Sequence, residues 1–422
     1  MKTHVYTLLV LGMLALLCLF SPQAVAQDAV VVGCPLPLGA SYGQNGMKGL
    51  TLAAEEINEK GGITVGGKKL PVKLEIVDTG DLDPKVSEAD ALAKVKSLIT
   101  DKKANFLIGG PARSEYGVAA MNVIADNNVV HIVSTGCYTP KWTAQFATDP
   151  AKYRKSFRMS GNIAFYIQEA KELLAALKKE YGFTKMFILI QDVQMCRDAA
   201  AIVKKVATAD GWQVVGEEAA PTETKDFSAQ FQKCKDSGAQ LLFLWSYSPN
   251  TADMFEQWRN MEVPALPMGF VEAAEDPGFW KITKGKCAYS IITLSEAGVT
   301  PSDVTPLAKP FYEAFDNRWG APPRATGSAA SYDALYALKD AIERAGSLDT
   351  DAVIKALEQT DLTTVRGQLK FDKDHQCVFG GDPKASILGN WAQWQDGQRV
   401  TIWPPAIKAG ELKMPPWLKI QK

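Results

Sequence analysis

The sequence predicts an α/β protein of two lobes, each built on a doubly wound parallel sheet. Short apolar runs of strand length alternate with segments whose apolar residues recur every three or four positions, and such alternation implies right-handed crossovers within a parallel sheet. The alternation runs through residues 30–134 and starts again after residue 160. A chain of 422 residues also exceeds one ordinary core, so two lobes of about 150–200 residues are expected.

The opening stretch predicts a strand, a turn and a helix in succession. An apolar run at 30–32 leads into a Pro- and Gly-rich loop at 35–43, after which Met47, Leu50 and Ile57 recur at helical spacing. In open α/β sheets the loops at the carboxyl ends of the strands form the ligand crevice. Residues 35–43 are therefore expected to form the first wall of a binding site.

The remaining elements follow in order. In the first half we expect strands at 70–78, 105–109 and 129–134, a short crossing strand at 157–160, and helices from residue 83 and over 115–127. In the second round we expect helices over 163–181, 198–210, 227–235 and 252–261, with strands at 186–192, 212–217, 240–246 and 266–269. The last part predicts helices over 307–319 and 328–345 and strands at 289–293, 368–371 and 392–394, and it shows no clear periodicity after residue 400.

The N-terminus has the pattern of a cleavable signal peptide over residues 1–26. Lys2 precedes an apolar run at 5–20, and residues 24–26 (AVA) have the small-x-small form of a cleavage site. The bulky Leu17 before Cys18 disfavours a lipid-anchored alternative. No later apolar run reaches the roughly 18 residues of a membrane span. We therefore expect an exported protein.

The net charge indicates the kind of partner to expect, and the cysteines bear on disulfide bonding. A formal net charge of -1 offers no electrostatic case for nucleic acid, so a small soluble ligand is the expected partner. Six cysteines remain after the signal peptide, widely spaced and without a CxxC pair: Cys34, Cys137, Cys196, Cys234, Cys287 and Cys377. Export permits disulfides, and buried free thiols are an equally good interpretation.

The patterns of nucleotide-binding sites and enzymes are missing. Residues 62–69 (GITVGGKK) imitate a P-loop, but Lys69 stands where Ser or Thr is required, and the segment follows a helix instead of a strand, which predicts a hairpin-like surface turn. No GxGxxG follows the first strand, no GxSxG or HExxH occurs, and only His131 and His375 follow the signal peptide. We therefore predict no catalysis, no cofactor and no metal.

The opening strand, the LGASYG loop and the EEINEKGGI helix end resemble the periplasmic leucine/isoleucine/valine-binding proteins, which are receptors of ABC importers. The resemblance extends to about Trp394. It implies a monomeric periplasmic protein of the type I periplasmic binding protein fold, with three chain crossings between the lobes near Ser160, Leu294 and Phe379. The first lobe would then comprise 27–160 plus 295–379, and the second 161–294 plus 380–422.

Polar residues after the third and fourth strands are candidates for holding a ligand carboxylate, which wants hydroxyls and backbone N–H groups. The third-strand loop offers Arg113 and Ser114, and the fourth offers Ser134, Gly136 and Tyr138. The resemblance implies a hydroxyl from the first loop, and an amide plus a hydroxyl from the second. A surface arginine and a helix N-cap serine are the alternatives for the first pair.

For a ligand ammonium, the resemblance implies an acidic residue at Glu272 and tyrosines at Tyr42 and Tyr247. A tyrosine ring can cover an aliphatic chain or a cation. The alternative for Glu272 is a merely acidic loop, because Glu275 and Asp276 follow it.

The chain also departs from the pattern of these receptors. Arg113 and Tyr138 stand where the family often has serine and threonine, and Cys196 and Arg197 stand where many relatives have tyrosine and glycine. The expected ligand is therefore a branched-chain or other apolar amino acid, with an aromatic acid, a dicarboxylic acid or an amide as alternatives. We expect delivery to an ABC permease, with a sensor for a separate receptor as the second possibility.

Overall fold

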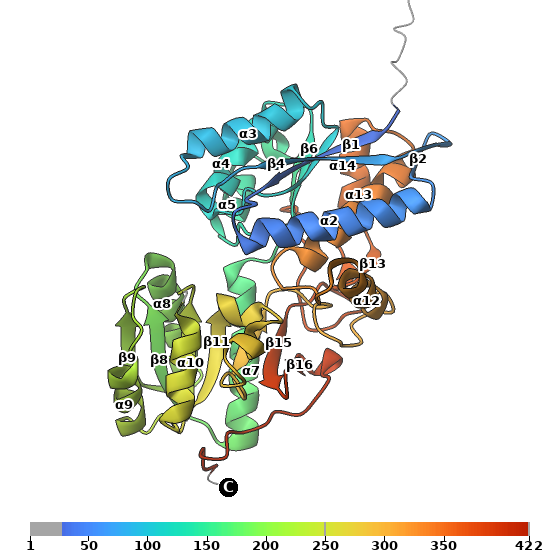
Figure 1. Ribbon diagram of the computed structural model, residues 1–422. Helices are drawn as coiled ribbons and strands as arrows, with labels where there is room; N and C mark the ends of the chain where they lie inside the picture. Colours follow the sequence, from blue (N-terminus) through green and yellow to red (C-terminus); the bar gives the residue numbers. More distant parts are fainter. Residues whose placement is uncertain (1–27, 249, 421–422) are drawn as a thin grey trace, which may run out of the picture.

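The computed structural model describes residues 28–248 and 250–420. The predicted signal peptide at 1–26 lies outside the described residues. Two α/β lobes lie one above the other, each with its own sheet (Figure 1). The predicted fold class is confirmed.

The first lobe holds a five-stranded sheet in the order β4-β1-β5-β6-β7, with all pairs parallel. Its strands are β1 (Val30–Leu36), β4 (Val72–Asp78), β5 (Phe106–Gly109), β6 (Val130–Val133) and β7 (Ser156–Arg158). Its helices are α2 (Ser41–Glu59), α3 (Glu88–Thr100), α4 (Ser114–Ala125), α5 (Lys141–Thr148), α6 (Pro150–Tyr153), α13 (Ser328–Ala345) and α14 (Thr350–Glu358).

The second lobe holds a seven-stranded sheet in the order β16-β15-β12-β11-β10-β8-β9. Its strands are β8 (Lys185–Gln191), β9 (Gln213–Ala220), β10 (Leu241–Ser246), β11 (Leu266–Val271), β12 (Ile291–Leu294), β15 (Asn390–Gln395) and β16 (Gln398–Trp403). The pairs β12–β15 and β15–β16 are antiparallel, and the others are parallel. Its helices are α7 (Ile163–Tyr181), α8 (Gln194–Ala209), α9 (Ser228–Asp236), α10 (Thr251–Asn260), η1 (Glu272–Glu275) and α11 (Phe279–Ile282), and α12 (Ala308–Trp319) lies between the lobes.

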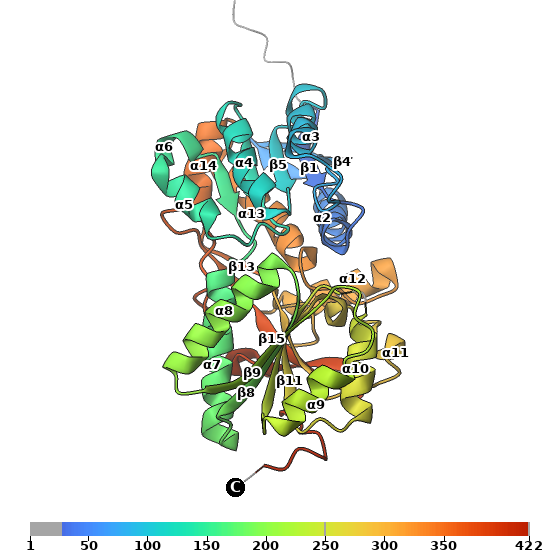
Figure 2. The ribbon, with the colours of Figure 1, turned by 90° about the vertical axis from the view of Figure 1, so that its left-hand side faces the viewer.

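Alternate residues of the central strands enter cores on opposite faces of each sheet, as the two-residue period of a strand requires. In β1, Val30 and Val32 pack with α2, α13 and α14, whereas Val31 packs toward α3 and α4. In β10, Leu244 packs with α10, whereas Phe243 packs with α7 and α8. Figure 2 shows α7 and α8 on one side of the second sheet and α9 and α10 on the other.

The packing of late segments bears on where the chain crosses between lobes. Val299 and Phe311 share a core cluster with Leu244 of β10. Buried residues of α13 and Ile387 pack in the first lobe instead, and Leu388 packs in the cluster of Leu244. The bounds of the lobes remain predictions, and we propose crossings near Gly327 and Ile387 in place of Leu294 and Phe379.

Several predicted details are wrong. The sequence predicts Tyr42 and Gly43 in a loop, but α2 already begins at Ser41. The predicted strand at 368–371 is β14 (Gly367–Leu369), which pairs with β13 (Leu362–Thr364) in a hairpin outside the two large sheets. The elements α14 and β16 were not predicted. The turn at 62–69 is confirmed as a hairpin of β2 (Ile63–Val65) and β3 (Lys68–Leu70).

The six cysteines of the described chain are free and buried. Within residues 28–248 and 250–420, no helix is both long and apolar enough to cross a membrane.

Candidate functional site

A cavity lies at the carboxyl ends of the second-lobe strands β10, β11 and β12, where the loop after β6 of the first lobe meets them. Its volume is about 40 Å³. The lining residues are Tyr138, Ile163, Tyr166, Met195, Trp245, Tyr247, Phe270, Thr293, Ser295 and Thr326. A cavity walled by both lobes suits a ligand that is enclosed on closure.

Aromatic residues make up half of the lining. The Tyr247 ring lies 4.9 Å from the Phe270 ring, and the Tyr138 ring meets Tyr166 edge-on at 5.6 Å. Tyr42, at the start of α2, lies with its ring 6.4 Å from that of Tyr138. The wall is therefore suited to a flat or branched apolar body.

Hydroxyl groups form most of the polar part of the cavity. The buried hydroxyls of Tyr166 and Thr293 have no hydrogen-bond partner among the described residues, and Ser295 Oγ and Thr326 Oγ1 are 3.0 Å apart. Burial raises the pKa of Tyr166 well above its usual value, so this phenol stays neutral and can donate. Buried polar groups in a native protein are normally hydrogen-bonded, so these two hydroxyls are available to a ligand.

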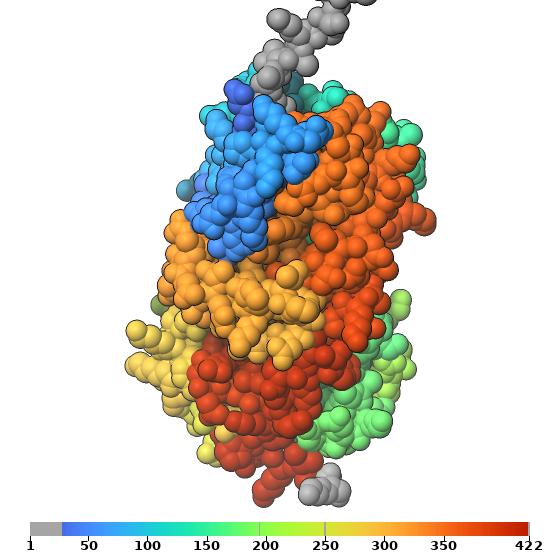
Figure 3. Space-filling model, turned by 90° about the vertical axis from the view of Figure 1, so that its right-hand side faces the viewer, coloured from blue at the N-terminus to red at the C-terminus, as the bar shows by residue number. Residues whose placement is uncertain are grey.

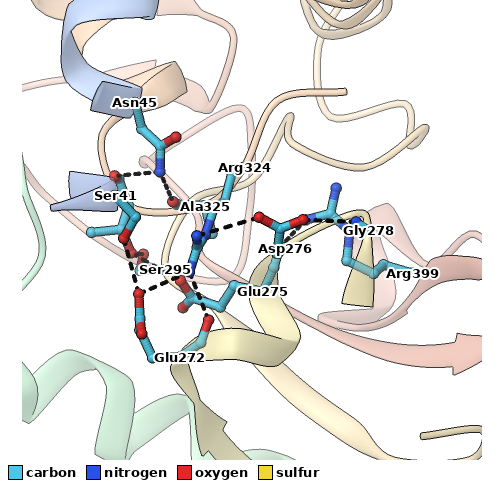
Figure 4. A network of polar contacts seen from close by, with 11 residues as sticks. Ser41, Asn45, Glu272, Glu275, Asp276, Gly278, Ser295, Arg324, Ala325 and Arg399 are labelled. Atoms are coloured by element: carbon cyan, nitrogen blue, oxygen red, sulfur yellow. Dashed lines mark hydrogen bonds and ion pairs between the residues drawn. The ribbon is translucent and has the colours of Figure 1, made fainter. Parts of the chain in front are cut away.

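Glu272, the predicted partner of an ammonium group, is already paired within the protein. The Arg324 guanidinium donates from Nη2 to Glu272 Oε1 at 2.8 Å and to the Glu272 carbonyl at 2.9 Å (Figure 4). Ser41, from the first lobe, donates to the same Oε1 at 2.9 Å. The carboxylate therefore has a cation beside it before any ligand binds.

Glu275 lies in the same network but is buried (Figure 4). Burial raises its pKa to about 8, against the opposing effect of Arg324. Thr326 Oγ1 donates to Glu275 Oε2 at 3.4 Å, and Arg399 donates to the Glu275 carbonyl at 2.7 Å. At neutral pH this carboxyl group is mostly protonated and carries little negative charge toward the cavity.

The residues predicted to hold a carboxylate are not together. Arg113 donates to the Tyr116 hydroxyl at 3.0 Å and stacks over that ring, away from the cavity lining. Ser114 is the first residue of α4, with Arg113 at the N-cap position, so the N-cap alternative for Ser114 is wrong. Ser134 Oγ lies 2.8 Å from Ser331 Oγ of α13, a buried contact between strand and helix.

The backbone conformation at position 136 requires a glycine. Its φ of +63° lies in the left-handed region, and a Cβ there would come within 2.5 Å of the Ala112 carbonyl oxygen. It does not belong to the cavity lining, so its predicted amide contact with a ligand stays a prediction.

The structure brings Tyr138 and Tyr247 to one cavity, with Tyr42 and Glu272 beside it. The sequence prediction did not include Tyr166, Thr293 or the pairing of Arg324. Tyr166 follows the predicted first crossing near Ser160 by a few residues, which could have drawn attention to it. Arg324 carries no local signal, since its partner lies far away in the sequence.

Within the described chain, no group of three or more His, Cys, Asp and Glu side chains is arranged to hold a metal ion. The polar groups of the cavity lining include hydroxyls and the indole N–H of Trp245, which can bind a ligand through neutral hydrogen bonds.

Comparison with known proteins agrees with this architecture. Residues 35–380 match the family described as periplasmic binding protein. The Leu/Ile/Val-binding protein homolog 7 of Brucella suis is 26% identical over 433 residues, covering 98% of this chain and 100% of the relative.

Two solved structures share the fold. A proposed branched-chain amino acid ABC transporter from Silicibacter pomeroyi has a TM-score of 0.81 at 21% identity, covering 92% of this chain and 100% of the other. An ABC transporter solute-binding protein from R. palustris, in complex with 4-hydroxybenzoate, has a TM-score of 0.67 at 21% identity, covering 92% and 96%. Since the family match spans most of the chain, this protein belongs to the periplasmic binding protein family.

Proposed function

We propose that the protein is an extracytoplasmic receptor of an ABC importer that binds a small carboxylic acid with an apolar body and no ammonium group. The ligand occupies the cavity between the lobes and is handed unchanged to a membrane permease. The named relatives support the receptor role, and the R. palustris protein in complex with 4-hydroxybenzoate is a precedent for an aromatic acid in this fold.

The observation that carries this proposal is the ion pair between Arg324 and Glu272. An ammonium group needs an uncompensated anion, and Glu272 already has a guanidinium at 2.8 Å. A second cation placed beside Arg324 would be repelled. The nearby Glu275 offers no replacement, because its raised pKa keeps it largely neutral. A ligand without an amine needs no uncompensated anion and is not repelled by Arg324.

The remaining groups suit such an acid. The unpartnered hydroxyls of Tyr166 and Thr293 supply neutral donors for a carboxylate. The rings of Tyr138, Tyr247 and Phe270 cover its apolar body. Aromatic acids and branched aliphatic acids both fit this description.

Closure links ligand binding to the receptor role. Ser41 donates to Glu272 across the lobes, and Asn45 of α2 donates to the Ala325 carbonyl at 3.1 Å. A ligand held by groups of both lobes binds the closed form more tightly and shifts the population toward it. The permease then distinguishes closed from open receptors.

An apolar amino acid is the second candidate ligand, and it is favoured by the name of the Brucella relative. Matched pairs separate the two candidates: leucine against 4-methylpentanoate, and phenylalanine against 3-phenylpropanoate, with 4-hydroxybenzoate as a further acid. A ligand at a hundred times its Kd stabilises the folded state by roughly 2.7 kcal/mol, which raises the melting temperature measurably.

We expect the acids to raise the melting temperature and the matched amino acids to leave it unchanged. A shift with leucine and none with 4-methylpentanoate would reverse the proposed ligand class. Turnover of an ester or amide in the same samples would overturn the receptor role itself.

A further inference from the structure

A second cavity lies between the lobes, on the molecular face shown in Figure 3. Its volume is about 520 Å³, far above the 40 Å³ of the cavity described above. The surface is hollowed between the blue atoms of α2 and the orange atoms of α12 and α13 (Figure 3). We call it the α12 groove. Its lining comprises Glu56, Lys60, Leu307, Pro310, Phe311, Ala314, Tyr332, Asp333, Tyr336, Lys339, Asp340, Glu343 and residues 362–365.

One wall of the α12 groove is aromatic and apolar. The Phe311 ring lies 4.8 Å from the Tyr332 ring, which lies 4.9 Å from the Tyr336 ring. Leu307, at the edge of the groove, is 46% exposed. Such a wall can cover the apolar part of a ligand, and its ring faces attract a cation.

Glu56 differs from the other acidic groups of the groove. The other three each pair with a cation: Asp333 with Arg366 at 2.9 Å, Asp340 with Arg344 at 2.8 Å and Glu343 with Lys339 at 2.6 Å. Glu56 instead accepts hydrogen bonds at Oε2 from the hydroxyls of Tyr332, at 2.6 Å, and Tyr336, at 2.7 Å. No cation of the described chain pairs with it, and its Oε1 accepts no hydrogen bond there.

Lys60 is the cation that could compete for Glu56. It lies four residues further along α2 and also lines the groove, but its side chain is exposed and forms no ion pair with Glu56. An exposed lysine gains little from such a pair, because water screens the charges and the long side chain loses conformational freedom. A ligand whose apolar body is held on the rings does not depend on the ion pair alone.

We propose that the α12 groove binds an organic cation, a primary ammonium or guanidinium group on an apolar body that carries no carboxylate. The charge lies at Glu56 Oε1, and the body lies against Tyr332 and Leu307. The two phenol donors hold the carboxylate in place, so little ordering is needed when the cation arrives. This site is separate from the proposed carboxylate site and takes a ligand of the opposite charge.

The groove is also placed to respond to movement of the lobes. Phe311 and Phe315 of α12 pack with the core that contains Leu244 of the second sheet, whereas α2 and α13 cover the first sheet. An occupant therefore contacts elements from both lobes. Its affinity depends on how far the lobes are closed, and by linkage it changes the affinity of the cavity ligand.

The test is isothermal titration of the mature protein with phenethylamine and with its neutral analogue 2-phenylethanol. We expect phenethylamine to bind at least about tenfold more tightly than the alcohol, and to lose that advantage in Glu56→Gln. The matched control is Glu59→Gln, an exposed residue at the end of the same helix with the same change of charge, which should bind like the unmodified protein.

The location of the phenethylamine site is tested with Tyr247→Phe and Phe270→Ala, which alter the proposed carboxylate site. Unchanged phenethylamine binding in both supports the α12 groove, and loss in these variants with retention in Glu56→Gln overturns the proposal. Equal binding of phenethylamine and 2-phenylethanol to the unmodified protein also overturns it, even where a variant fails to fold.

Discussion

Arg324 Nη2 lies 2.8 Å from Glu272 Oε1, and the two side chains come from segments 52 positions apart in the chain. Their side chains are only 16% and 26% exposed, so the pair is partly shielded from water. The resemblance in sequence assigns Glu272 to a ligand ammonium, whereas this contact gives the carboxylate a partner within the protein. The charge beside Glu272 therefore depends on a residue outside the expected set.

Replacing Arg324 should change the ligand preference. In Arg324→Gln the Glu272 carboxylate loses its cation, so leucine should gain affinity relative to 4-methylpentanoate by about tenfold, which corresponds to about 1.4 kcal/mol. Isothermal titration of both ligands measures the ratio. Arg318→Gln is the control, because that arginine pairs with Glu55 on the surface. A ratio that stays the same in both variants would count against the proposed role of Arg324.

The hydroxyl of Ser41 should stabilise the closed form. Ser41→Ala removes a hydrogen bond between the lobes to a charged acceptor, and we expect ligand affinity to fall by roughly five- to tenfold. Small-angle scattering should show a larger fraction of open receptor at equal ligand concentration. Gln44→Ala, which removes a contact to Leu38 within the first lobe, serves as the control. If both variants bind alike, the contact does not contribute to closure.

Removing the Thr293 hydroxyl should weaken ligand binding without lowering the stability of the free protein. Thr293 Oγ1 is buried without a partner among the described residues, so Thr293→Val leaves the free protein at least as stable as before. Acid binding should weaken by about tenfold, because the carboxylate loses a donor. Thermal unfolding with and without ligand measures both effects. A large loss of stability in the free protein would show that the hydroxyl has a structural partner instead.

Stability should depend on pH through Glu275. Burial raises its pKa from the usual 4.5 to about 8, so between these values the folded state keeps a proton that the unfolded state has lost. The free energy of unfolding then falls as pH rises, by at most roughly 1.4 kcal/mol per pH unit, and levels off above the folded pKa.

Glu275→Gln should flatten this profile in denaturant titrations between pH 5 and pH 8. Glu169, Glu296 and Asp333 also have raised pKa values because they are buried, so part of the slope should persist in the variant. An identical slope in the variant and the unmodified protein would show that Glu275 is already ionised in the folded state.

Local signals account for the elements that were predicted well. Helix α7 has the predicted bounds because Asn162 accepts a hydrogen bond from Phe165 N at its start and Gly182 adopts φ +71° at its end. The same kind of signal is present at α14, where Asp349 caps the helix by accepting from Ala352 N. Strand β16 has no such signal, because its position depends on pairing with β15.

The sequence alone determined the alternation of strands and helices and the two lobes, since apolar periodicity depends on neighbouring residues. The edge of the sheets at which a ligand binds stays a prediction. The sequence also identified Tyr138 and Tyr247, which line the cavity. Tertiary structure decided which polar groups are available to a ligand. Arg113 turned to Tyr116, Ser134 to Ser331, and Glu272 to Arg324. These pairings depend on which segments fold against each other, so a side chain that looks available in the sequence can have its partner within the protein.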